Sequence, residues 1–125
     1  MKKTIYTENA PKPAGPYSQG IKVDNFLFVS GQIAIDPTQG KIVATNIKEQ
    51  TKTVIENIKA ILQTANYNLS DIVQANVYLS SMQLFTEFNS VYATYFDKDF
   101  PARVTVEAKL PQSALVEISA IANKE

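Results

Sequence analysis

The feature that most limits how this chain can fold is residues 46–65, where apolar side chains recur at the spacing of an α-helix. Asn46 and, three residues later, Glu49 resemble a capping box, which predicts that the helix begins there. A helix that is apolar on one side only must pack that side against another element of the fold. The apolar positions are Ile47, Val54, Ile58, Ile61, Leu62 and Ala65.

The segments around this helix have the alternating or short apolar patterns of β-strands. A second helix with a broad aromatic stripe is predicted over residues 82–96. Residues 7–20 hold three prolines and two glycines, which predicts an extended loop, and residues 36–40 have the composition of a turn. The predicted strands are residues 21–31, with an extension to 35 past a kink at Gly31, and residues 73–79, 103–109 and 116–122.

The order of these elements predicts one α+β domain over residues 1–125. Two amphipathic helices would cover one face of a mixed sheet, and the more apolar strand over residues 116–122 would lie near its centre. The opposite face of that sheet would carry more apolar residues than a surface in water normally does. We therefore expect that face to pack against other subunits.

The composition argues against several classes of function. Twelve basic and 12 acidic residues are spread evenly, so no basic stripe is present to bind the phosphates of duplex nucleic acid. Histidine and cysteine are absent, which removes the usual general base, the commonest metal ligand and all thiolate chemistry. The sequence has no phosphate-binding glycine loop, nucleophile elbow or metal cluster. It also has no recognisable signal peptide or membrane-spanning run, so the cytoplasm is the predicted location.

Arg103, the only arginine, is the first candidate for a functional residue. It begins the strand predicted over residues 103–109, in which polar and apolar residues alternate, so that its four polar residues share one face. A planar guanidinium can grip a carboxylate with two parallel hydrogen bonds. The alternative is an arginine in an ordinary surface salt bridge.

Glu117 is the second candidate, because it is an ionisable residue within the apolar strand over residues 116–122. A buried carboxylate is costly unless it is paired or hydrogen-bonded, which predicts a role in orienting or deprotonating water. The alternatives are a strand edge that faces solvent and a structural pairing with a lysine.

Four further residues are weaker candidates. Tyr17 presents a phenol on the predicted loop, and Ser30 with Gly31 offers a hydroxyl beside a close backbone approach. Each of these also fits ordinary turn chemistry. Asn89 lies at the edge of the aromatic helix stripe, where a residue that bonds nearby backbone is the simpler interpretation.

Five segments of this chain resemble the RidA family, also called the YjgF family, in the same order and spacing over nearly the whole length. The segments are Thr7–Pro11, Gly15–Gly20, Ser30–Ile33, Pro101–Arg103 and Val116–Ile118. The resemblance implies a chorismate-mutase-like subunit that forms a homotrimer, with the sheets as an inner barrel and a ligand site in each cleft between neighbouring subunits.

The resemblance also implies an activity, that of a 2-iminobutanoate/2-iminopropanoate deaminase, which hydrolyses 2-imino acids to 2-keto acids and ammonia. It implies that Arg103 binds the substrate carboxylate and that Glu117 positions the attacking water. It further implies that the cleft is lined by Tyr17, Ser30, Gly31 and Asn89. Where many deaminase-type members have Arg-Ser-Cys-Val, this chain has Thr105 at the cysteine position, and Thr105 is expected to take that residue's place in binding the substrate. This holds if the position acts mainly through its backbone; a property that depends on the thiol would be lost.

This chemistry agrees with the composition, because an imine carbon is already electrophilic and hydrolysis needs orientation, a carboxylate grip and a placed water. No metal or cofactor and no nucleic acid or membrane partner is expected. Two alternatives remain open at this point: a ligand-binding or regulatory member with little turnover, and a ribonuclease or translation inhibitor. The neutral charge and the absence of histidine argue against the second.

Overall fold

The structure, a computed structural model, describes all of residues 1–125 and is organised around one six-stranded sheet. The strand order is β1-β2-β3-β8-β6-β7, and only the β6–β7 pair is parallel. A separate two-stranded hairpin, β4–β5, follows β3. The strands are β1 Lys3–Ile5, β2 Gly20–Val23, β3 Phe26–Gln32, β4 Ile35–Asp36, β5 Lys41–Ile42, β6 Ile72–Leu79, β7 Ala102–Glu107 and β8 Val116–Asn123.

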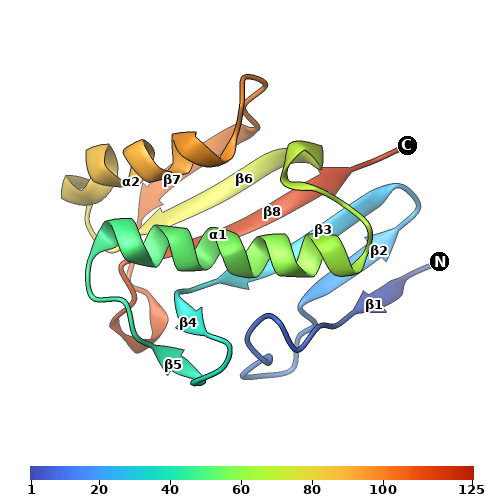
Figure 1. Cartoon of the computed structure of the whole chain (residues 1–125), viewed down its shortest axis with the longest axis horizontal. Coiled ribbons are helices and arrows are strands. Elements are labelled where there is room, and N and C mark those ends of the chain that lie inside the picture. The colour runs from blue at the N-terminus through green and yellow to red at the C-terminus, as the bar shows by residue number, and fades with distance from the viewer.

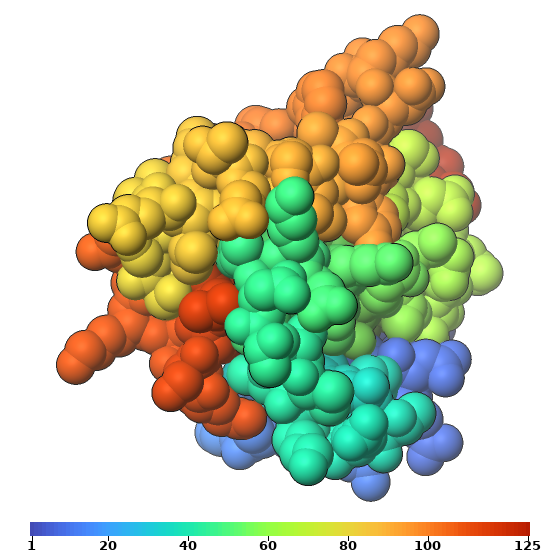
Figure 2. Space-filling view, turned by 60° about the vertical axis from the view of Figure 1, so that its left-hand side comes forward, coloured from blue at the N-terminus to red at the C-terminus, as the bar shows by residue number.

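Two helices, α1 Ile47–Thr64 and α2 Phe85–Tyr92, lie on the same side of this sheet (Figure 1). α1 packs against β3 and β8, and α2 packs beside α1. The space-filling view shows α1 in green next to the yellow and orange α2, with the segment around residue 100 projecting from one corner (Figure 2). The predicted α+β class, the mixed sheet, the two helices on one face and the central position of β8 are all confirmed. No helix is long and apolar enough to cross a membrane.

The predicted first helix is confirmed, with Asn46 as its N-cap. The amide of Glu49 donates to Asn46 Oδ1 at 2.9 Å, and Asn46 Nδ2 donates to Glu49 Oε2 at 3.0 Å. The buried face also includes Gln50, which accepts from the Leu115 amide and donates to the Ala44 carbonyl, both at 3.0 Å. Gln50 therefore ties α1 to the start of β8, the strand that carries Glu117.

The second predicted helix, over residues 82–96, is present, but only its middle part is α-helical. The structure has a 3₁₀ turn over Met82–Leu84, eight residues of α-helix, and a second 3₁₀ turn over Ala93–Tyr95. Phe96 is already extended, with φ of −124°. In a 3₁₀ turn, as in an α-helix, residues i and i+3 lie on the same side. A stripe of aromatic residues in the sequence therefore cannot tell an α-helix from a 3₁₀ turn.

The prediction of one strand over residues 21–31 is wrong, because the segment forms the β2–β3 hairpin. Asp24 has φ of +51° at the tip of that hairpin, a conformation that Asp and Asn tolerate better than other side chains. The short strand β1 and the β4–β5 hairpin were not predicted. The strands predicted over residues 73–79, 103–109 and 116–122 are present as β6, β7 and β8, with small differences at their ends.

The sheet face away from the helices, which we call the open face, is rich in exposed apolar side chains. Phe26, Phe28, Val104 and Val106 are each between 42% and 47% exposed. The register aligns Phe26 and Phe28 with residues of β8 at one end of the sheet, and Val104 and Val106 lie on the edge strand β7. The prediction that the face of the sheet opposite the helices is apolar is therefore confirmed for the open face.

Candidate functional site

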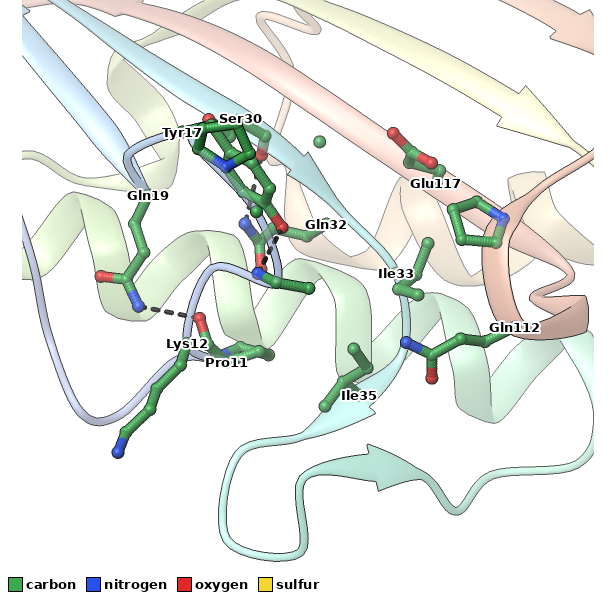
Figure 3. Close-up of a pocket in the computed structure, with 15 residues that line it drawn as sticks. Pro11, Lys12, Tyr17, Gln19, Ser30, Gln32, Ile33, Ile35, Gln112 and Glu117 are labelled. Atoms are coloured by element: carbon green, nitrogen blue, oxygen red, sulfur yellow. Dashed lines mark hydrogen bonds between the residues drawn. The ribbon is translucent and has the colours of Figure 1, made fainter.

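A pocket of about 560 Å³ lies where the N-terminal loop, β3 and the start of β8 meet, and we call it the acid pocket (Figure 3). It brings together four of the residues singled out from the sequence: Tyr17, Ser30, Gly31 and Glu117. Its other lining residues are Pro11, Lys12, Ala14, Gly15, Pro16, Gln19, Gln32, Ile33, Ile35, Pro111 and Gln112.

Glu117 enters the acid pocket from β8, whose side chains alternate strictly between the two faces of the sheet. Val116 and Ile118 are buried under the helices, while Glu117 points to the open face and is only partly buried. It is thus flanked by apolar residues in sequence but does not pack among them. Burial nevertheless raises the pKa of Glu117, because the surrounding protein solvates the carboxylate less well than water does.

Gly31 makes room for the Glu117 carboxylate. A Cβ at position 31 would overlap the Glu117 Oε2 atom and press against the carboxyl carbon at 3.1 Å. Gly31 lies in a β-bulge, since the pairing of β3 with β8 shifts between Val29 and Gln32. The absence of a side chain here therefore serves close approach and is not required by the backbone angles.

The loop that carries Tyr17 is held by buried hydrogen bonds from Gln19. Gln19 Oε1 accepts from the Thr7 amide at 2.7 Å, and Gln19 Nε2 donates to the carbonyls of Thr7 and Pro11, each at 2.9 Å. The Tyr17 hydroxyl accepts from the Ala14 amide at 3.2 Å, and the ring remains half exposed. The loop is thus fixed in place while the face of Tyr17 stays open to the pocket.

The Ser30 hydroxyl donates to the Ser18 carbonyl, so it is engaged in holding the loop against β3. Its oxygen lone pairs remain free to accept from a ligand. Lys12, at the other side of the pocket, points away from Glu117 (Figure 3). Lys12 and Glu117 are the only two charged residues that line the acid pocket, and they lie on different sides of it.

Arg103 and Asn89 line a second, smaller pocket of about 280 Å³, which we call the arginine pocket. The Arg103 Cζ atom lies 5.7, 5.5 and 4.9 Å from the ring centroids of Phe85, Phe88 and Tyr92, all on α2. Cation–π contacts of this kind are each worth roughly 0.5–2 kcal/mol, depending on how far the site excludes water. The guanidinium is therefore held by aromatic rings and not by the ordinary surface salt bridge considered from the sequence.

Arg103 and Glu117 point to opposite faces of the sheet. Arg103 pairs with Ala75 of β6, which pairs with Ala120 of β8, and both alanines are buried beneath the helices. Glu117 pairs with Tyr78, in a row that ends at Val106 on the open face. A single chain therefore does not bring the two predicted catalytic residues together.

Thr105 lies on the same side of β7 as Arg103, opposite the buried Val77, but it lines neither pocket. The prediction that the polar residues of this strand share one face is confirmed for Arg103, Thr105 and Glu107, which all point toward the helices. Lys109 lies beyond the end of β7.

Several lining residues were not singled out from the sequence. Gln112, with φ of +56°, borders the acid pocket, and no pattern around it indicates this unusual backbone. Tyr92 lines the arginine pocket and was interpreted only as part of the aromatic stripe. Phe100 also lines this pocket and was not proposed as a site residue. No group of three or more His, Cys, Asp or Glu side chains is arranged to hold a metal ion.

Comparison with known proteins identifies the family. The sequence model described as Endoribonuclease L-PSP matches residues 7–124. The chain belongs to this family, which includes the YjgF, RutC and Rid proteins. It is 58% identical to a RutC family protein of Pyrococcus horikoshii over the full length of both chains. It is 55% identical to a RutC family protein of Saccharolobus solfataricus, with 99% of each chain covered.

Solved structures of the family have the same fold. A Rid family protein of Yersinia pestis superposes with a TM-score of 0.95 at 42% identity, covering 99% of this chain and 100% of that one. The YjgF gene product of E. coli superposes with a TM-score of 0.93 at 38% identity, covering 98% and 99%. E. coli TdcF with bound serine gives a TM-score of 0.94 at 35% identity, with 98% and 99% covered.

Proposed function

We propose that this protein hydrolyses 2-imino acids to 2-keto acids and ammonia without a cofactor, in a site formed by the arginine pocket of one chain and the acid pocket of a neighbouring chain. The observation that carries the proposal is the guanidinium of Arg103, which is held against aromatic rings and lines a pocket of about 280 Å³. A cation held in this way is available to a small carboxylate. This is the role that the family resemblance implies for Arg103.

The two pockets offer complementary chemistry. The arginine pocket supplies a bidentate donor for a carboxylate, and the acid pocket supplies a carboxylate for the attacking water. Because the two groups point to opposite faces of the sheet, the proposal requires assembly, and the apolar open face is a suitable surface for it. We propose a homotrimer with its sheets on the inside, which is the assembly that the family resemblance implies; a heterologous contact repeated by rotation forms such a ring when the rotation closes.

In the proposed reaction, Arg103 fixes the substrate carboxylate so that C2 of the imine faces Glu117 of the neighbouring chain. With the imine nitrogen protonated, Glu117 takes a proton from water as the oxygen attacks C2, and the C=N π electrons move to nitrogen to give a neutral tetrahedral carbinolamine. Glu117 then returns that proton to the carbinolamine nitrogen, the C2–N bond breaks to release ammonia, and the hydroxyl oxygen forms the keto group as its own proton passes to Glu117 and on to ammonia. Such positioning can supply roughly 7–11 kcal/mol of the barrier in well-oriented reactions.

A related protein supports the choice of ligand class. E. coli TdcF has been solved with bound serine, a small α-carboxylate that carries nitrogen on C2. A 2-imino acid has the same carboxylate and also carries nitrogen on C2, joined there by a double bond. The proposal places the reaction in the cytoplasm, where pyridoxal-phosphate-dependent dehydratases release 2-imino acids.

Mixing two inactive variants provides the test. Arg103→Ala and Glu117→Ala are each expected to lose the acceleration of ammonia release from 2-iminobutanoate freshly generated by a threonine dehydratase. When the two are unfolded together and refolded at equal amounts, about one interface in four of a ring carries both an intact Arg103 and an intact Glu117. About a quarter of the wild-type rate should therefore return.

The two variants refolded separately and then combined are the control and should remain inactive if the assembled subunits do not exchange. No recovery in the co-refolded mixture, with a trimeric mass, would overturn the shared site. Full activity of Arg103→Ala would overturn the assignment of Arg103.

The same preparations address the alternatives raised by the sequence. A regulatory member would bind 2-oxobutanoate and be stabilised by it without accelerating hydrolysis of any imino acid. The family description names an endoribonuclease, so purified protein should also be tested on RNA, with Arg103→Ala alongside. Cleavage by the wild type that disappears in the variant would favour that activity.

A further inference from the structure

Two buried side-chain polar atoms in this chain have no hydrogen-bond partner, Tyr92 Oη and Thr105 Oγ1, and both belong to residues close to Arg103. Tyr92 has the ring nearest the guanidinium, at 4.9 Å, and Thr105 follows Arg103 by two residues on the same face of β7. Leaving a buried polar group unsatisfied costs about 1–3 kcal/mol, so each such group needs an explanation.

Tyr92 lines the arginine pocket, whereas Thr105 does not. The Tyr92 ring lies between the rings of Phe88 and Phe96 in two tilted contacts, with centroid separations of 5.4 and 4.9 Å. Only 5% of the residue is exposed. The ring therefore has no freedom to turn its hydroxyl toward bulk water, and the hydroxyl stays beside the guanidinium.

The electrostatics at Tyr92 agree with this geometry. Burial raises the pKa of Tyr92, and Arg103 opposes that rise only in part, through its positive charge and through the closeness of its N–H donors to the hydroxyl. No N–H of the guanidinium has the distance and angle of a formed hydrogen bond to Tyr92 Oη in the free protein. The phenol is consequently neutral at physiological pH and keeps an oxygen that can accept a hydrogen bond. The guanidinium has five N–H donors, and a bidentate carboxylate uses two of them.

We infer that Tyr92 is a positioning residue for Arg103: its hydroxyl accepts a guanidinium N–H when a carboxylate is bound and fixes the rotation of the guanidinium plane. The rings of Phe85, Phe88 and Tyr92 limit where the guanidinium can lie. They do not determine which edge of its plane faces the pocket. An acceptor beside one edge of the guanidinium, in line with an N–H bond, does determine it. This inference rests on the proposed function, in which Arg103 holds the substrate carboxylate.

The test replaces Tyr92 by phenylalanine, which keeps the ring and its contact with the cation. Because the lost hydroxyl has no partner in the free protein, Tyr92→Phe should melt at the same temperature as the wild type or higher. Its Kd for 2-oxobutanoate, measured by calorimetry, should be about tenfold weaker, since a hydrogen bond to a charged group is lost. KM for the imino acid should rise by a similar factor with kcat within about twofold, as expected when ground-state and transition-state binding are lost alike.

A comparison of two ligands separates positioning from a general disturbance of the pocket. 2-Oxobutanamide has the same size as 2-oxobutanoate but no carboxylate, so Tyr92→Phe should bind it as the wild type does. Tyr95→Phe is the matched control: it removes a hydroxyl from the adjacent 3₁₀ turn, where burial and Glu56 raise the pKa of Tyr95 to about 12, and it should leave both affinities unchanged.

Equal affinity of Tyr92→Phe and wild type for 2-oxobutanoate would overturn the inference, and so would an equal loss for the acid and the amide. Arg103→Ala distinguishes these failures from a failure of the proposed function. If Arg103→Ala also binds 2-oxobutanoate normally, the carboxylate role itself is wrong. If only Arg103→Ala loses the acid, the proposed function stands and the role of Tyr92 does not.

Discussion

The acid pocket and the arginine pocket are built in different ways. The acid pocket is formed largely by loops and a bulged strand, and buried hydrogen bonds such as those of Gln19 keep its walls in place. The arginine pocket is formed by α2, the turn after it, the Phe100–Pro101 segment and the edge strand β7, and cation–π contacts with three rings of α2 keep Arg103 in place. The comparison indicates that substitutions in the loops can change the surroundings of the Glu117 carboxylate. The position of the Arg103 guanidinium depends instead on how the aromatic rings of α2 pack.

The largest expected difference between the pockets lies in how their charged groups affect the kinetics. Glu117→Gln should lower kcat by about 100-fold or more with little change in KM, because general acid–base catalysis typically contributes that much. Arg103→Lys keeps the charge but loses the planar fork, and should mainly raise KM, by about tenfold. Steady-state rates of ammonia release with 2-iminobutanoate measure both, and a reversed pattern would contradict the assignment of roles.

Gly31→Ala should disturb the acid pocket alone. The added Cβ overlaps the end of the Glu117 side chain, so the carboxylate must move from its present position. Activity should fall by about tenfold, as expected for a misplaced catalytic group, while the melting temperature changes little because a flexible side chain can yield. Unchanged affinity for 2-oxobutanoate would show that the arginine pocket is intact; a large loss of that affinity would contradict the separation of the two pockets.

The pH dependence of the reaction should reflect Glu117 and not Arg103. A general base acts as the carboxylate, which predominates above its pKa, and burial raises the pKa of Glu117 above its ordinary value of 4.5. Activity should therefore fall as the pH is lowered through a midpoint higher than that of an ordinary glutamate. The pH profile of kcat/KM would show this acid limb in the wild type and lose it in Glu117→Gln. An acid limb that persists in the variant would assign it to another group.

The smallest expected effect concerns the backbone beside the acid pocket. Ser113 has φ of +56°, a left-handed conformation that glycine adopts without strain. Ser113→Gly should stabilise the chain by up to about 1 kcal/mol, which corresponds to a rise of roughly 3–5 °C in the melting temperature. Differential scanning calorimetry measures this, with Ser90→Gly on the exposed side of α2 as a control that should destabilise. A fall in the melting temperature for Ser113→Gly would show that the serine side chain contributes more than the strain costs.

The sequence predicts the strongly periodic parts of the fold because their patterns express burial directly. α1 is marked by its apolar spacing and by Asn46, and β8 is marked by alternation over its whole length. The β2–β3 hairpin was missed because its turn depends on the single residue Asp24 in a left-handed conformation, inside a run that is otherwise typical of one strand. Short strands such as β1 exist only through their pairing with a neighbour and leave little local signal.

The candidate site is only partly predictable for a related reason. Alternation along β7 shows that Arg103 and Thr105 share a face, but not which face the helices cover. Burial of the valines would be the simple expectation, and the structure has the reverse: Val104 and Val106 join the open face, and Arg103 lies under α2. Arg103 can lie under α2 because the aromatic rings of that helix interact favourably with a cation. Val104 and Val106 can lie on the open face because the neighbouring strands are also apolar there.

The bulge in β3 has a consequence for how relatives of this chain can be compared. Between Val29 and Gln32 the strand advances three residues while β8 advances only from Ala120 to Ile118, so β3 contains one residue more than regular pairing requires. Gly31 lies within this bulge, next to the Glu117 carboxylate. The side chain of the following residue, Gln32, is buried in the core. A family member shorter by one residue at this point would keep every buried contact of the strand and lose the room for the carboxylate. Chain length between these two positions therefore decides whether a relative can hold a carboxylate in the way that this chain does.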